Sequence, residues 1–192
     1  MLTHTDPLPQ EPKRILIAGT SGSGKTTFAR ALARALHLPY TEIDSLFHGP
    51  GWTPRPEFVA DVTTLTQQTE WVTEWQYHQV RPLLAANAQL LVWLDYPRSL
   101  IMWRVIKRTI RRWATREELW NGNRERNLWR SFTDREGIIR WAWQTHRLTG
   151  ERVRELEAAA ASPTIVRLRN PLEAQGWLDA TAAMRDRGAT LD

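Results

Sequence analysis

The feature that most constrains this chain is a glycine-rich segment near its N-terminus, Gly19-Thr-Ser-Gly-Ser-Gly24-Lys25-Thr26, which fits the pattern G-x-x-x-x-G-K-[ST]. It follows a short apolar run, Arg14 to Gly19, of the kind that forms a buried strand. Apolar residues at helical spacing come next, from Thr26 to His37. A strand, a glycine-rich turn and a helix N-terminus in this order predict a loop whose backbone N–H groups surround phosphate oxygens.

The chemistry of such a loop assigns roles to its side chains. Lys25 is expected to reach the β- and γ-phosphates of a nucleotide, and the Thr26 hydroxyl is expected to bind Mg²⁺. ATP and Mg²⁺ are therefore the expected cofactors. The residues expected to bind the nucleotide in this loop are Gly19, Thr20, Ser21, Gly22, Ser23, Gly24, Lys25, Thr26 and Thr27.

The rest of the chain alternates strand-like and helix-like segments, which predicts a three-layer α/β fold with a five-stranded parallel sheet. The expected strands are 14–19, 40–44, 71–74, 89–95 and 164–168. Helices are expected over 26–37 and 57–68, after Pro97, and from Pro171 to about Arg187. Residues 1–12 contain three prolines and are expected to form a mobile arm, and residues 13–192 are expected to form a single domain.

Between the last two expected strands lies a long segment, residues 98–161, whose pattern is mostly helical. It is longer than a simple crossover connection requires. Residues 98–154 hold 15 basic and 6 acidic side chains, a net charge of +9, whereas the whole chain carries +5. We expect a basic lid or subdomain here, with a turn at Asn121-Gly122-Asn123. Charge alone does not decide whether it meets nucleotide phosphates, a nucleic acid or an acidic membrane.

Composition excludes several classes of protein. The chain has no cysteine, so it has no disulfide, thiol nucleophile or thiolate zinc site, and none of its five histidines is paired at the i, i+4 spacing of helical metal sites. No run approaches the roughly 18 apolar residues of a membrane span, and the polar N-terminus does not fit a signal peptide. A cytoplasmic protein is expected, with no membrane partner; the sequence does not indicate an oligomeric state.

Several further motifs carry a family resemblance. Asp95-Tyr-Pro97, followed by Arg104 and Arg108, resembles the adenylate kinase segment in which a strand ends in Asp-x-Pro. The other matching segments are Ile43-Asp44-Ser-Leu-Phe, Gly51-Trp52, Trp71-Val72, Trp93-Leu-Asp95, residues 116–125 and Trp141-Ala-Trp-Gln-Thr-His146. Together they resemble small kinases called topology-modulation proteins, which are related to adenylate kinases. The resemblance spans about residues 14 to 180.

This resemblance implies a P-loop NTPase sandwich of the nucleoside-monophosphate-kinase type and an ATP-dependent phosphotransferase activity. The acceptor would be a nucleoside monophosphate or another small hydroxyl- or phosphate-bearing molecule. Arg104 would stack on the ATP base, Arg108 would contact its phosphates, and Arg81 would face the acceptor's negative charge. Arg81 could instead be a solvated residue at a helix start. The lid arginines that could close on phosphates are Arg108, Arg111, Arg112, Arg116, Arg124 and Arg126, with Arg108 and Arg124 foremost.

The acidic residues leave alternatives open. Where the family has Asp-Gly-Asn-Tyr, this chain has Glu74-Trp75-Gln76-Tyr77, so Glu74 would be the acid on the Mg²⁺ side and a bulky Trp75 replaces glycine. Asp95, which ends an apolar strand, is the competing metal-side acid. Asp44 ends the expected second strand and is assigned to the acceptor as a hydrogen-bond acceptor or base, although it could simply cap a helix.

Two functions from different classes fit these features. The first is a kinase that binds the acceptor between Asp44, Trp52 and Arg81 under a basic lid. The second is a nucleotide-regulated nucleic-acid-binding protein, with weak or no kinase activity, in which the basic segment contacts backbone phosphates and tryptophans stack on bases. Binding to a nucleic acid would weaken steeply with salt, whereas a closed kinase site would be much less sensitive.

Overall fold

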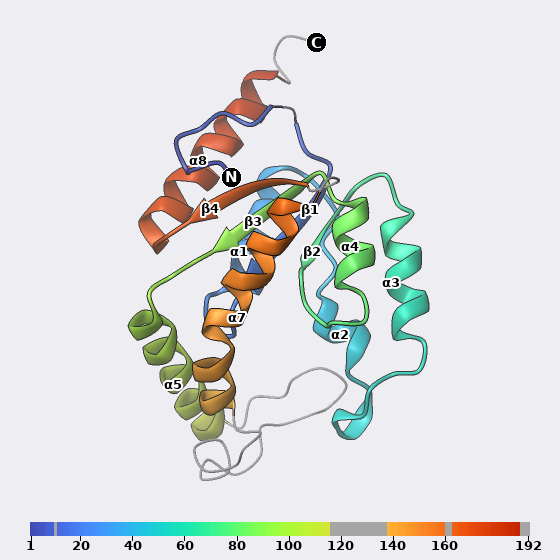
Figure 1. Cartoon of the computed structure of the whole chain (residues 1–192), viewed down its shortest axis with the longest axis vertical. Helices are drawn as coiled ribbons and strands as arrows, with labels where there is room; N and C mark the ends of the chain where they lie inside the picture. Colours follow the sequence, from blue (N-terminus) through green and yellow to red (C-terminus); the bar gives the residue numbers. More distant parts are fainter. Residues whose placement is uncertain (10, 116–137, 160–162, 189–192) are drawn as a thin grey trace.

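The computed structural model describes residues 1–9, 11–115, 138–159 and 163–188. At its centre is a parallel sheet with the strand order β2-β1-β3-β4 (Figure 1). The strands are β1 (Arg14–Gly19), β2 (Trp71–Glu74), β3 (Leu90–Leu94) and β4 (Thr164–Leu168). Ile17 pairs with Glu74 and Gly19 pairs with Leu94, so the carboxyl ends of β1, β2 and β3 meet at one edge of the sheet.

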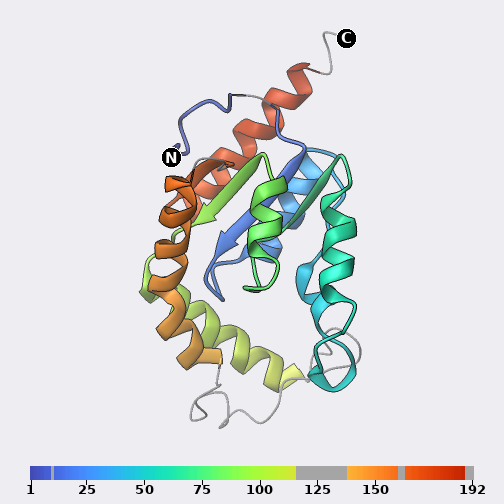
Figure 2. The ribbon, with the colours of Figure 1, turned by 45° about the vertical axis from the view of Figure 1, so that its right-hand side comes forward.

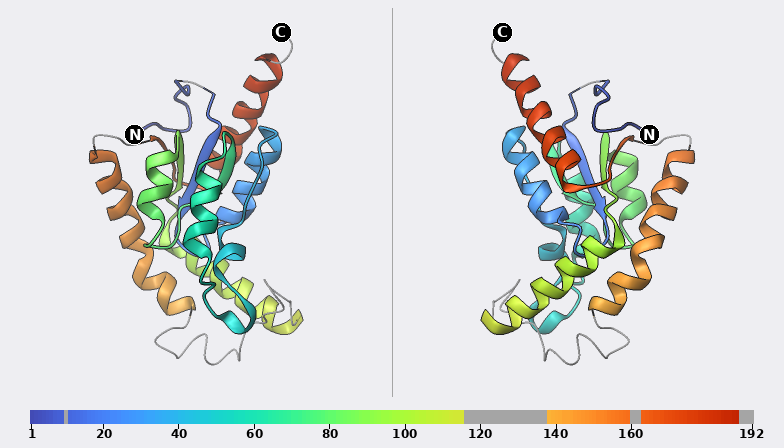
Figure 3. Two further views of the ribbon diagram at one scale, coloured as in Figure 1. Left: turned by 90° about the vertical axis from the view of Figure 1, so that its right-hand side faces the viewer. Right: turned by 90° about the vertical axis from the view of Figure 1, so that its left-hand side faces the viewer.

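Helices cover both faces of this sheet, as the three-layer prediction requires. The helices are α1 (Lys25–Ala35), α2 (Ile43–Phe47), α3 (Phe58–Thr66), α4 (Arg81–Asn87), α5 (Arg98–Thr115), α7 (Ile138–Ala158) and α8 (Pro171–Gly188), with a 3-10 turn η1 (Pro50–Trp52). Seen from the side, α1 and α8 lie on one face of the sheet, and α4 and α7 lie on the other (Figure 3). The α/β class is therefore confirmed.

Each face of the sheet has its own apolar core, because successive residues of a strand point to opposite faces. Ile15 and Ile17 of β1 are fully buried on the side of α1 and α8, where the rings of Phe28 and Trp177 lie 6.2 Å apart. Leu16 is fully buried on the opposite side, among residues of α2, α3, α4 and α7. A central strand buried on both faces explains the unbroken apolar run in the sequence.

The prediction of five strands is wrong for the described part of the chain, where the sheet has four. The missing strand is 40–44. Its first part does pair with β2, because the Val72 N–H donates to the Pro39 carbonyl (2.9 Å) and the Thr41 N–H donates to the Val72 carbonyl (3.0 Å). The chain then turns into α2, so Asp44 lies in the first turn of a helix rather than at a strand end.

The N-terminal residues, which are expected to form a mobile arm, contact the sheet through Leu2. Leu2 pairs in parallel with Val166, with its N–H donating to the Ile165 carbonyl (2.7 Å) and its carbonyl accepting from the Arg167 N–H (2.9 Å). Leu2 also packs against the core beneath α8. This pairing covers the outer edge of β4, which would otherwise expose unpaired backbone groups.

The segment expected to form a lid is only partly described. Its described parts are mainly helices α5 and α7, which run side by side near the carboxyl edge of the sheet (Figure 2). Residues 116–137 and 160–162, including the expected turn at 121–123, lie outside the described residues. Within the described ranges, no helix is both long and apolar enough to cross a membrane.

Candidate active site

The glycine-rich loop lies at the carboxyl end of β1 and leads directly into α1. Gly22 (φ +86°) and Gly24 (φ +94°) both adopt left-handed backbone conformations that favour glycine. A Cβ atom on Gly22 would lie 2.4 Å from Cγ2 of Val105 and 3.1 Å from the carbonyl oxygen of Ile101. The loop is therefore fixed by its own turns and by close contact with α5.

Replacing Gly22 with alanine should weaken ATP binding by at least about tenfold. The added methyl group would clash with α5 in a backbone conformation that costs about 1–3 kcal/mol for other residues. The matched control is Gly176→Ala on exposed α8, where a Cβ meets no atom within 4 Å. That variant should keep its ATP affinity and gain about 0.5–1 kcal/mol of stability. Calorimetric titration with ATP and thermal unfolding of both variants measure the two effects. Equal ATP affinities in Gly22→Ala and Gly176→Ala would contradict the role of the loop in ATP binding.

Lys25, the first residue of α1, is buried, and its ammonium group donates to the Thr20 carbonyl at 3.3 Å. Burial lowers the pKa of Lys25 to about 8, and the negative charges of Asp44 and Glu74 oppose that shift. The lysine thus lies close enough to both carboxylates to be influenced by their charges. The structure brings together three residues that the sequence assigned to one site.

Two arginines of α5 also reach the loop. Arg104 donates to the Ser23 carbonyl (3.1 Å), and its guanidinium group lies over the ring of Tyr96, 5.4 Å from the ring centre. Arg108 donates to the Ser21 hydroxyl (3.3 Å). Both predicted nucleotide-side arginines therefore contact the loop. Arg111 is exposed on the same helix, the side chain of Arg112 is not described, and Arg116, Arg124 and Arg126 lie outside the described residues.

Glu74, at the end of β2, is one of the few charged residues buried in the described structure, at 1% exposure. Its carboxylate accepts hydrogen bonds from the Tyr40 hydroxyl (2.6 Å) and from the Ile43 N–H (3.0 Å), and the nearby Thr26 hydroxyl favours its ionised form. Burial raises the pKa of Glu74, while these donors oppose the shift. A carboxylate and a hydroxyl side by side are the oxygen ligands that suit a hydrated Mg²⁺.

Asp95, the competing acid, has a different partner. It follows β3 and forms an ion pair with Arg167 of β4, whose Nε lies 2.8 Å from the Asp95 carboxylate. The same guanidinium group lies over Trp93, 4.9 Å from the ring centre. Asp95 is therefore neutralised between two strands, whereas Glu74 lies beside Thr26.

Asp44 lies in α2 and accepts two hydrogen bonds on one oxygen. The Gln76 amide (2.8 Å) and the Tyr77 hydroxyl (2.6 Å) both donate to Oδ1. The helix-cap alternative is not what the structure contains, because the residue before α2 is Glu42 and no side chain caps that helix. Asp44 instead belongs to a polar cluster with the turn that follows β2.

Sequence reasoning missed the aromatic residues around Asp44. The Tyr77 hydroxyl also lies 3.2 Å from Nε2 of His48, and the Tyr77 ring stacks on Phe47 at 4.0 Å between ring centres. Trp52, a predicted neighbour of the acceptor, packs edge-on against His48 with 5.1 Å between ring centres. Two features of the sequence could have indicated this cluster. Asp44 and His48 are four residues apart, and Tyr77 matches the tyrosine of the family segment Asp-Gly-Asn-Tyr.

Arg81 begins α4, close to the cluster but on the side of α7. Its guanidinium group lies over Trp75 (5.9 Å to the ring centre), and its carbonyl accepts the indole N–H of Trp75 at 3.1 Å. The pKa of Arg81 is lowered by burial and, to a smaller extent, by the positive charge of Arg152 on α7. Among the described residues neither of these two arginines has a carboxylate partner.

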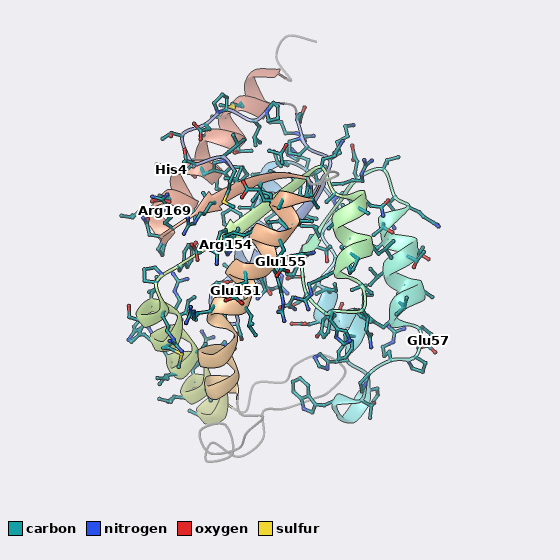
Figure 4. All side chains as sticks on the ribbon, in the orientation of Figure 1. His4, Glu57, Glu151, Arg154, Glu155 and Arg169 are labelled. Carbon is teal, nitrogen blue, oxygen red and sulfur yellow. The ribbon has the colours of Figure 1, made fainter. Side chains whose placement is uncertain are left out.

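The position of Arg152 on α7 was not anticipated. Figure 4 labels Glu151, Arg154 and Glu155, which are exposed along this helix. Arg152 is half-buried instead and lies near enough to Arg81 for the two charges to repel. Among the described residues no carboxylate offsets this repulsion, so an anion near both arginines would lower it.

A parallel sheet whose first strand runs through a glycine-rich loop into a helix, with a buried lysine at the helix start, defines the class of P-loop proteins. Comparison with protein families is more specific. The AAA domain family AAA_18 matches residues 15–119, which is more than half of the chain, so the protein belongs to this family. A comparison with curated proteins found no match.

Solved structures of kinases share the fold. A shikimate kinase from Acinetobacter baumannii, in complex with shikimate, superposes with a TM-score of 0.54 at 15% identity, covering 91% of this chain and 94% of that one. A sugar kinase from Janibacter sp. HTCC2649 gives 0.50 at 18% identity, covering 92% and 95%. A gluconokinase from Sinorhizobium meliloti 1021 gives 0.50 at 17% identity, covering 94% and 98%. At these identities the similarity shows the fold alone.

Proposed function

We propose that the protein is an ATP-dependent phosphotransferase that moves the γ-phosphoryl group of ATP to a small acceptor. The observation that carries this proposal is the meeting of Lys25, Asp44 and Glu74 at the carboxyl edge of the sheet, beside the glycine-rich loop. Nucleotide binding alone would not require Asp44, a second carboxylate beside Glu74 that is held by its own hydrogen bonds from Gln76 and Tyr77. The kinases of similar fold, and the resemblance to adenylate-kinase-related topology-modulation proteins, support the same reaction class.

The nucleotide would lie along the loop from Gly19 to Thr27, with its phosphates against the backbone N–H groups and Lys25, and its base near Arg104. Ser23 supports a bound polar group here, because its hydroxyl is buried and has no hydrogen-bond partner within the described part of the chain. The Thr26 hydroxyl and the Glu74 carboxylate would hold a hydrated Mg²⁺. When bound, that ion would offset the charge that develops on the phosphates during transfer.

Asp44 would act on the acceptor. Among the described residues both donors to Asp44 are on Oδ1 and none is on Oδ2, and the carboxylate lies within the electrostatic reach of Lys25. A carboxylate oxygen in this state can accept a hydrogen bond from an acceptor hydroxyl and take its proton. Arg108 would stabilise the transferring group together with Lys25, and Arg124, which lies outside the described residues, is proposed for the same role.

Arg81 and Arg152 suggest that the acceptor is anionic. The two guanidinium groups repel each other, and a carboxylate or phosphate group of the acceptor would relieve that repulsion. The acceptor would then extend from Asp44 of α2 towards α4 and α7, with its negative group at the far end. A nucleoside monophosphate and a phosphorylated or carboxylated hydroxyl compound both meet this requirement.

Replacing Arg81 with methionine should raise the KM for an anionic acceptor by about 10- to 100-fold, because a charge-assisted hydrogen bond contributes about 1.5–3 kcal/mol. The KM for ATP should stay within about twofold. The matched control is Arg154→Met, which removes an exposed arginine two residues beyond Arg152 on α7. Steady-state kinetics of both variants make the measurement, and an equal loss in both, or a loss confined to the KM for ATP, would rule out the acceptor role.

The proposed function is tested by ADP release from Mg·ATP in the presence of nucleoside monophosphates, nucleosides and small hydroxylated acids and phosphates, with Lys25→Ala as the blank. We expect one chemical class of acceptor to stimulate release in the wild-type protein and none to do so in the variant. Tight ATP binding without stimulation by any acceptor would contradict the proposal.

A further inference from the structure

The hydrogen bonds around Asp44 determine which side chain donates and which accepts in a short series of three residues. An ionised carboxylate can only accept, so the Tyr77 hydroxyl donates its proton to Oδ1 of Asp44 across 2.6 Å. The Tyr77 oxygen is then free to act as an acceptor towards Nε2 of His48, 3.2 Å away. Nε2 of His48 must therefore carry a hydrogen. The order of donors is His48 to Tyr77 to Asp44.

Tyr77 is held in place from several directions. Its backbone has φ +59°, a left-handed conformation that residues other than glycine, asparagine and aspartate rarely adopt. Its carbonyl accepts the N–H groups of Val80 and Arg81 at the start of α4, both at 3.1 Å. Its ring lies between Phe47, stacked at 4.0 Å, and Phe58, edge-on at 5.2 Å. Strained backbone maintained by surrounding contacts is typical of a side chain whose exact placement serves a site.

The consequence falls on Asp44. Because Tyr77 and Gln76 both donate to Oδ1, that oxygen is saturated and the carboxylate is prevented from rotating. Within the described part of the chain no donor reaches Oδ2, so that oxygen remains for a ligand. A phosphate oxygen, already negatively charged, would be repelled by this carboxylate, whereas a hydroxyl group can donate a hydrogen bond to it.

We propose that Tyr77 and His48 are positioning residues that fix Asp44 for an acceptor whose reacting group is a hydroxyl. This inference rests on the proposed function and narrows it. In the transfer step the hydroxyl oxygen forms a bond to the γ-phosphorus, and the bond from that phosphorus to the bridging oxygen breaks. The bonding pair leaves with ADP, and the hydroxyl proton passes to Oδ2 of Asp44.

Tyr77→Phe tests this series, because it removes only the hydroxyl and keeps the ring between Phe47 and Phe58. We expect kcat with the stimulating acceptor to fall about 10- to 100-fold, since a small misplacement of a reacting group has effects of this size. The KM for ATP should change less than twofold. Acceptor-stimulated turnover equal to that of the wild type, alongside a large loss in Asp44→Asn, would overturn the proposal and leave the proposed function standing.

Two substitutions of His48 separate positioning from simple packing. In His48→Gln the side-chain amide occupies the place of Nε2 and can still donate to Tyr77, whereas in His48→Asn it reaches only the place of Nδ1. We expect glutamine to keep kcat within about threefold and asparagine to lower it about as much as Tyr77→Phe. Equal losses in the two variants would contradict the donor role of His48.

The tautomer of His48 gives a readout that does not depend on turnover. Long-range ¹H–¹⁵N correlation spectra of the ¹⁵N-labelled protein, at a pH where the imidazole is neutral, should show the Nε2–H tautomer in the wild type. Tyr77→Phe should alter the Nε2 shift, because its acceptor is gone. If His48 of the wild type is the Nδ1–H tautomer, the proposed hydrogen-bond order from His48 through Tyr77 to Asp44 is wrong, even if a kinase activity is found. If no acceptor is phosphorylated at all, the proposed function fails instead.

Discussion

Replacing Lys25 with alanine should lower acceptor-dependent ADP release by about 10²- to 10³-fold or more. The ammonium group is buried at the start of α1 beside the loop, where water screens it weakly, so its effect on charge developing at the phosphates is large. Only two other lysines exist in the chain, Lys13 and Lys107, and neither lies in the loop. Steady-state ADP release at saturating Mg·ATP and acceptor measures the loss.

Lys107→Ala is the matched control for this experiment. Lys107 lies on the exposed side of α5, 4.9 Å from the ring centre of Trp103, and takes no part in the loop. Its removal should change ADP release by less than about twofold. Lys25→Ala should also unfold no earlier than the wild type, because it removes a charge that burial disfavours. A drop of similar size in both variants, or no drop in Lys25→Ala, would count against phosphate binding by Lys25.

Asp44→Asn should lower acceptor-dependent kcat by about 10²- to 10⁴-fold, the range that general-base catalysis provides. The amide keeps the size of the side chain but cannot take a proton from the acceptor. ATP binding should stay within about threefold, because the proposed partner of Asp44 is the acceptor rather than the nucleotide. Acceptor-dependent kinetics and a calorimetric ATP titration measure the two effects separately.

Asp179→Asn is the corresponding control, since Asp179 is exposed on α8 and accepts a hydrogen bond from Gln175 at 2.8 Å. It should leave both kcat and ATP affinity unchanged. If Asp44→Asn retained full acceptor-dependent turnover, the base role would be wrong. If it lost ATP affinity and turnover equally, Asp44 would belong to the nucleotide site instead.

The phosphate loop and the sheet were accessible from sequence because local patterns determine them. The apolar run of β1 and the glycine-rich turn indicate a buried strand followed by a tight loop, and both occur where expected. The second strand was not predictable in the same way. Residues 39–41 do pair with β2, but Glu74, distant in sequence, accepts the N–H of Ile43 and ends that pairing.

The two acidic candidates show the same limit. Glu74 ends one buried strand and Asp95 follows another, so their local sequences do not separate them. The distinction depends on their partners, Arg167 for Asp95 and the Thr26 region for Glu74, and these come from other strands and helices. Only the tertiary structure shows that one acid is neutralised and the other faces the loop.

The acceptor side was the least predictable part of the site. Tyr77 contributes only because its backbone is left-handed and turns its hydroxyl towards Asp44, and no residue pattern encodes that conformation for a tyrosine. Arg152 comes close to Arg81 because α7, in the segment between β3 and β4, lies on the same face of the sheet as α4. Long-range packing, rather than local propensity, determines both positions.

The most direct test of phosphoryl transfer follows phosphorus itself. A ³¹P NMR time course of Mg·ATP, wild-type protein and the stimulating acceptor should show the γ-phosphate resonance replaced by a phosphorylated-acceptor resonance in equal amount to ADP. The reaction should be absent in Lys25→Ala. Inorganic phosphate as the sole new product, or ATP that stays intact with every acceptor, would contradict the assignment of this protein as a phosphotransferase.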